Sequence, residues 1–88
     1  MNKARRKQIE GINGRIAAML SLAEGIKADV EAVRDDEQDY LDNMPESLAV
    51  GDKGGQAELA IAALDQVIDD LESLIGNDFA ALLAEAAQ

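Results

Sequence analysis

Two runs of apolar residues, spaced alternately three and four apart, constrain the fold of this chain more than any other feature. The first run is Ile9, Ile12, Ile16, Met19, Ala23, Ile26, Val30 and Val33, and the second is Ile61, Leu64, Ile68, Leu71, Ile75 and then Leu82. This spacing places each run along one side of an α-helix. A seven-residue repeat keeps that side against a partner helix over many turns. The sequence therefore predicts an all-α fold, an antiparallel helical hairpin of the coiled-coil type.

The residues around the two runs set the boundaries of the hairpin. Asn2 is an acceptable N-cap for the first helix. Pro45 pushes Met44 out of the helical region, so that helix is expected to end just before it. The expected elements are a helix over about 3–42, a connection over about 43–54 and a helix over about 55–86, all in one domain of residues 1–88.

The triplet Gly76-Asn77-Asp78 is a weak point in the second helix, because it looks like a C-cap followed by a new N-cap. Either the helix breaks at 76–78 and a short third helix starts at Phe79, or it continues. Ile75 and Leu82 keep the seven-residue spacing across the triplet, so we expect a continuous helix.

The hairpin is expected to oligomerise. A chain of 88 residues buries too little surface for a comfortable stability margin, and without Cys it has no disulfide to supplement its core. Apolar residues outside the two runs form a second flank: Leu20, Leu22, Leu59, Val67 and Leu74. A lone two-helix hairpin cannot cover both sets, so we expect a homodimer or a larger helical bundle.

Charge and hydropathy exclude two kinds of partner. The formal net charge is −10, and the segment from Gly54 to Gln88 has acidic residues but no basic one. Direct nucleic-acid binding by that half is not expected, because it depends on Lys and Arg contacting phosphates. No stretch approaches the roughly 18 apolar residues of a membrane span, and the start lacks a signal-peptide pattern, so a cytoplasmic protein is expected.

Catalytic chemistry finds little support. The chain has no His and no Cys, and none of its serines lies beside a Lys that could activate it. No phosphate-binding glycine motif or EF-hand spacing appears. The acidic residues from Asp35 to Asp42 fit a solvated helix face better than a metal site. We therefore expect a non-enzymatic protein without a cofactor or a metal.

The charges of the first helix oppose its own dipole. Four of the eight cations lie at its start, and acidic residues lie at its end. Salt could simply screen these charges. Two hairpins packed antiparallel would instead place the basic start of one beside the acidic end of the other. The candidate binding residues are then Lys3, Arg5, Arg6 and Lys7 of one chain and Asp39, Tyr40, Asn43 and Met44 of another.

The segment from Asp36 to Leu48, with Asp-Asn-Met-Pro-Glu at residues 42–46, follows a basic start and precedes an acidic heptad region. In this combination the chain resembles a family of small, mostly uncharacterised proteins of tailed bacteriophages and prophages. The resemblance implies a phage or mobile-element origin, with a host-cell location if phage-encoded, and a helical hairpin. It implies no established activity.

Three functions fit a small acidic helical protein of this type. The first is an anti-defence factor that sequesters a host immune protein or a small anionic nucleotide second messenger. The second is a DNA mimic, in which a row of carboxylates imitates phosphates: Glu58, Asp65, Asp69 and Glu72. The third is a passive structural or assembly oligomer.

Overall fold

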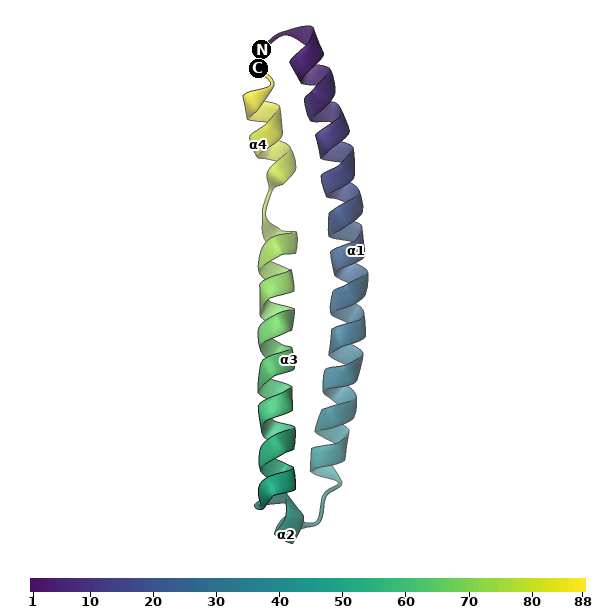
Figure 1. The fold of residues 1–88 in the computed structure, drawn as a ribbon, viewed down its shortest axis with the longest axis vertical. Helices are drawn as coiled ribbons and strands as arrows, with labels where there is room; N and C mark the ends of the chain where they lie inside the picture. The colour runs from purple at the N-terminus through teal and green to yellow at the C-terminus, as the bar shows by residue number, and fades with distance from the viewer.

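The computed structural model describes residues 1–88 as an elongated, entirely helical hairpin (Figure 1). Its elements are α1 (Lys3–Asp42), α2 (Glu46–Ala49), α3 (Asp52–Gly76) and α4 (Phe79–Ala86). α3 and then α4 run back along α1, so the two termini lie together at one end and α2 lies at the other. The expected all-α hairpin is confirmed, with extents of 67 × 16 × 13 Å.

Local signals at both ends of α1 explain its length. The Asn2 side chain accepts a hydrogen bond from the backbone N–H of Arg5 at 2.8 Å, which satisfies one of the free donors of the first turn. At the other end the backbone N–H of Asn43 donates to the carbonyl of Asp39 at 3.0 Å. Pro45 then stops α1 from continuing, because the residue before a proline is disfavoured in the helical region.

The connection between the long helices is shorter than expected and is partly helical. α2 occupies Glu46–Ala49, and α3 already begins at Asp52, inside the expected loop. Gly54 is buried against α2, and a Cβ atom at position 54 would collide with the carbonyl group of Ala49. Glycine therefore lets the start of α3 pack directly onto α2, which leaves little loose chain.

The expectation of a continuous second helix is wrong. α3 ends at Gly76, the backbone of Asn77 is extended, and Asp78 begins α4 by accepting a hydrogen bond from the N–H of Ala81 at 3.0 Å. Gly, Asn and Asp are poor in helix interiors but good at helix ends, and this local preference prevails over the heptad spacing. As a result Leu83 is half-buried, whereas Leu82 remains 65 % exposed.

The apolar seam is the set of residues through which α1 and α3 contact each other. In α3 it consists of the expected residues, but in α1 it differs in part. The α3 members of the seam are all buried or half-buried: Ile61, Leu64, Ile68, Leu71 and Ile75. On α1, Ile16, Ala23 and Val30 also belong to the covered side. The alternate seam positions of α1 are displaced by one residue, because Leu20, expected on the flank, is half-buried and Met19 is exposed.

This hairpin covers its own apolar residues poorly. Only Ala23, Gly54, Ala57 and Ile61 are buried. The radius of gyration is 20.1 Å, against about 12 Å for a compact chain of this length. The exposed surface is 6361 Å², against about 5,000 Å² for a compact monomer of the same mass.

Candidate functional site

A line of exposed apolar side chains along α1 is the most distinctive surface of the hairpin. Its members, called the exposed stripe below, are Ile12, Met19, Ile26, Val33 and Tyr40. They repeat every seven residues, so they lie on one side of the helix. Each keeps between 42 and 56 % of its surface exposed. Arg5 precedes Ile12 by seven residues and therefore continues the same line.

Ion pairs between α1 and α3 lie along the edge of the helix contact that is away from the exposed stripe. Lys27 Nζ lies 3.1 Å from Glu72 Oε1, and Arg34 Nε donates to Asp65 Oδ1 at 2.9 Å. Lys27 and Arg34 each follow a stripe residue directly, and consecutive residues are about 100° apart around a helix. The stripe therefore lies on the other side of the seam from these ion pairs.

Apolar residues of α3 extend the stripe. Glu72 and Asp65 fix one edge of α3 at the ion pairs, so Val67 and Leu74, on the other edge, lie on the same face of the hairpin as the stripe. Val67 is 43 % exposed, and Leu74 is half-buried. The hairpin thus has one ionic edge and one apolar face that runs along both long helices.

Small residues make the surface beside the stripe uneven. Each directly precedes a stripe residue: Gly11, Ala18, Gly25 and Ala32. Nothing lies within 4 Å of a Cβ placed at Gly11 or Gly25, so both face open space. One shallow hollow includes Gly11 and is lined by Gln8, Gly11, Ile12 and Arg15. A second one beside it is lined by Ile12, Arg15, Ile16 and Met19. Such hollows can accept side chains of another helix.

The ion pairs favour the charged forms of Lys27 and Arg34. The hydrogen bond with Glu72 raises the pKa of Lys27 above its usual value, and the hydrogen bond with Asp65 does the same for the pKa of Arg34. Glu31 also lies near Lys27, at 3.7 Å, and adds to the effect there. Two of the four carboxylates in the proposed DNA-mimicking row, Asp65 and Glu72, are therefore already paired with cations of α1.

The basic end of α1 lies beside the end of α4. Arg6 Nε donates to the carbonyl of Ala87 at 3.0 Å, and the amino group of Met1 donates to the carbonyl of Gln88 at 2.8 Å. Cations here oppose the dipole of α1 but complement the negative end of α4. Arg6 is therefore tied to the end of α4 by an exposed hydrogen bond. Lys3, Arg5 and Lys7 form no side-chain hydrogen bond or ion pair within the hairpin.

The acidic end of α1 carries the other half of the expected binding site. Tyr40 is exposed and Met44 is half-buried. Asn43 Nδ2 donates to the carbonyl of Asp39 at 2.8 Å, so part of its donor capacity serves to close the helix. The start of α3, with its partial positive charge, lies at this same end of the hairpin (Figure 1).

The two halves of the expected site lie at opposite ends of a hairpin 67 Å long. Within one chain, Arg5 therefore cannot contact Tyr40 or Asn43. A joint site would need a second chain, and it remains a prediction.

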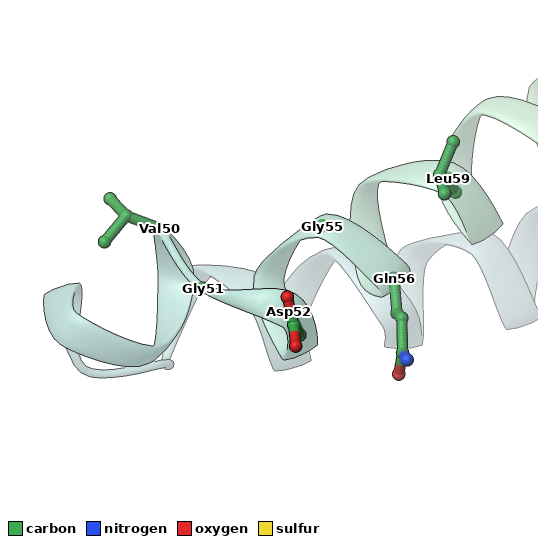
Figure 2. Close-up of a pocket in the computed structure, with 6 residues that line it drawn as sticks. All are labelled: Val50, Gly51, Asp52, Gly55, Gln56 and Leu59. Atoms are coloured by element: carbon green, nitrogen blue, oxygen red, sulfur yellow. The ribbon is translucent and has the colours of Figure 1, made fainter.

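A shallow hollow at the start of α3 is a feature that the sequence reasoning missed. Its lining residues are Val50, Gly51, Asp52, Gly55, Gln56 and Leu59. Figure 2 shows Val50 and Leu59 projecting to one side, with Gly55 between them, whereas Gln56 points the other way. Val50 and Leu59 are 82 and 72 % exposed. Polar groups do not converge on this hollow, so it has no features of a specific ligand site.

No group of acidic side chains is arranged to hold a metal ion. None of the four helices is both long and apolar enough to span a bilayer. In comparisons with known proteins, no family model, no curated protein and no solved structure matches this chain.

Proposed function

We propose that this protein is a non-catalytic binding protein whose working form is a bundle of two or more hairpins. The observation that carries the proposal is the exposed stripe, which joins Val67 and Leu74 in one apolar face. Burying apolar surface stabilises by about 25 cal/mol per Å². Long apolar faces on soluble proteins commonly mark interaction sites.

The surface area supports an interface of the size found in stable dimers. The hairpin exposes 6361 Å², which is about 1,300 Å² more than expected for a compact monomer of its mass. Two copies that each buried this excess would share about 2,600 Å² in total, within the range of permanent homodimers.

The target of such a bundle follows from the resemblance and from the charged ends. As a phage or mobile-element accessory protein, it would act in the host cytoplasm by sequestering an immune protein or an anionic nucleotide second messenger. Arg5 and Lys7 support this role, because both are exposed and no group of the hairpin satisfies their donors. Cationic donors of this kind suit phosphates and acidic protein segments.

The alternatives differ in what the surface does. A DNA mimic needs a free carboxylate row, and the pairing of Asp65 and Glu72 with α1 speaks against it. A passive structural oligomer would use the same apolar face but bind no target.

Light scattering coupled to size exclusion tests the oligomer. The unmodified protein should elute with at least twice its monomer mass at micromolar concentration, and Ile26→Asp should yield a monomer that remains helical. Ala17→Asp is the matched control, because Ala17 is exposed on the opposite side of α1, and this variant should stay oligomeric. A 9.4 kDa monomer for the unmodified protein would contradict the proposal.

A second experiment tests the role. The purified oligomer is incubated with extract of host cells, recovered and heat-denatured, and the released molecules are identified by mass spectrometry. A released nucleotide, or a host defence protein retained by the unmodified oligomer but lost with Arg5→Ala, supports sequestration. If neither the unmodified oligomer nor Arg5→Ala retains a nucleotide or a host protein, the result would favour the passive structural oligomer.

A further inference from the structure

We infer that a second copy of this chain packs on the exposed stripe with its α1 antiparallel, related by a two-fold axis that crosses α1 between Leu22 and Ile26. The inference rests on the proposed oligomer and adds its orientation and register. It also specifies which residues of the two chains meet.

Charge determines the orientation. Each hairpin has a basic end at Lys3–Lys7 and an acidic end at Asp35–Asp42, separated along most of its 67 Å length. A parallel pair would place basic end on basic end and acidic end on acidic end. The antiparallel pair places opposite charges together at both ends, and complementary charges favour the correct alignment over wrong ones.

The length of the stripe determines the register. The line from Arg5 to Tyr40 has its midpoint next to Leu22, so an axis between Leu22 and Ile26 lets nearly all of the line overlap its own copy. Leu22, which is 65 % exposed beside the stripe, then lies opposite Ile26 of the second copy. At this central layer, two large apolar side chains interdigitate.

The same register pairs charged residues that have no cross-helix partner within the hairpin. Arg15 lies opposite Val33 of the second copy and within one helical turn of that copy's Asp36. The side chains of Arg15 and Asp36 are both exposed in the hairpin, and Arg15 forms no ion pair there. In a parallel pair Arg15 would instead meet Arg15. Gly25 and Ala18 beside the seam allow the two helices to approach closely.

This arrangement completes the candidate site at each end of the dimer. Arg5 lies opposite Asn43 of the second copy and within one turn of that copy's Tyr40. A cation, an exposed ring and an amide then come from two chains to one place, and two such places exist in each dimer. Neither chain can form the site alone.

Cross-linking of single-cysteine variants tests the orientation, since the chain has no Cys of its own. Ile12→Cys and Asp36→Cys are made separately, mixed, allowed to exchange and oxidised with copper phenanthroline. The inference expects the mixed disulfide between positions 12 and 36 to dominate by at least about tenfold over either homodimeric one. In the antiparallel pair, two copies of position 12 lie 24 residues apart along the helices, about 36 Å.

Ala17→Cys mixed with Glu31→Cys is the matched control. These positions lie at equivalent heights but on the opposite side of α1, so they should not cross-link. Dominant 12–12 and 36–36 disulfides would show a parallel pair and overturn the inference while leaving the oligomer intact. A dimer without cross-links at any of these positions would show that the stripe is not the interface, and this also overturns it. A monomer would contradict the proposed oligomer itself.

Charge reversal gives an independent test of the register. Arg15→Glu and Asp36→Arg should each weaken dimerisation about tenfold, and the double variant should recover most of the loss, because the pair is restored with opposite sign. Light scattering over a dilution series measures the dissociation constant. Two single variants without effect would contradict the proposed pairing.

Discussion

Arg34 on α1 and Asp65 on α3 are joined by a hydrogen-bonded ion pair of 2.9 Å, and this contact helps to set which side of α1 faces α3. Lys27 and Glu72 repeat the contact one heptad away along both helices. With these two cations at the edge of the seam, Val33 and Ile26 are turned outward. The exposed stripe therefore lies on the side of α1 away from these two ion pairs.

The seam itself should be sensitive to charge, unlike the outer surface of α3. Leu71→Asp should destabilise the hairpin by about 2–4 kcal/mol, because Leu71 is half-buried and an unpaired carboxylate would enter an apolar contact. Chemical denaturation followed by circular dichroism measures the loss. Leu59→Asp is the control at a position that is 72 % exposed, and it should be nearly neutral. Equal losses for both variants would contradict the assigned seam.

Lys27 should make stability depend on alkaline pH. Its pKa is raised in the fold, chiefly by the hydrogen bond with Glu72, so its stabilising effect is present below the ordinary Lys pKa of 10.5. It should be lost as the pH rises through the higher pKa of the folded state. The difference in urea midpoint between the unmodified protein and Lys27→Met should therefore shrink from about pH 8 to about pH 12. Lys53→Met is the control, because it removes a cation that forms no ion pair. Its difference in urea midpoint from the unmodified protein should not shrink over this pH range.

Adjacent glycines at the start of α3 should respond to alanine in opposite directions. Gly54→Ala should destabilise the hairpin by about 1–3 kcal/mol, because the new Cβ collides with the Ala49 carbonyl and separates α2 from α3. Gly55→Ala meets nothing within 4 Å and should stabilise the helix by up to about 1 kcal/mol. Thermal unfolding of both variants is the measurement. A stabilising Gly54→Ala would show that α2 does not pack there.

The cap of α4 should hold the last helix in place. Asp78→Ala should remove the hydrogen bond to the N–H of Ala81 and cost α4 about 1 kcal/mol. Hydrogen exchange of the amides in residues 79–86 should accelerate, with little change in residues 52–76. Asp78→Asn keeps a side-chain acceptor, so the amides of residues 79–86 should still exchange slowly in this variant. Uniform acceleration along α3 and α4 would indicate that the two helices unfold as one unit.

Much of the hairpin could be predicted from the sequence. The seven-residue repeat from Ile61 to Ile75 identifies the covered side of α3 because only one side of that helix is rich in large apolar residues. Asn2 and Pro45 bound α1 through local effects that hold in any context. The charged candidate residues at the two ends could be named from the sequence, but their separation within one chain depends on the length of the hairpin.

What the sequence determined by itself is that α1 pairs with another helix through a line that includes Ile16, Ala23 and Val30. Two alternate lines can complete that seam, one with Met19 and Ile26 and one with Leu20 and Lys27. Apolarity favours the first. In the tertiary structure the line with Leu20 and Lys27 faces α3. Lys27 and Arg34 then contact Glu72 and Asp65, which are more than 30 positions away in the sequence and come within reach only when α3 lies beside α1. The more apolar line was left exposed, where it can bind another molecule.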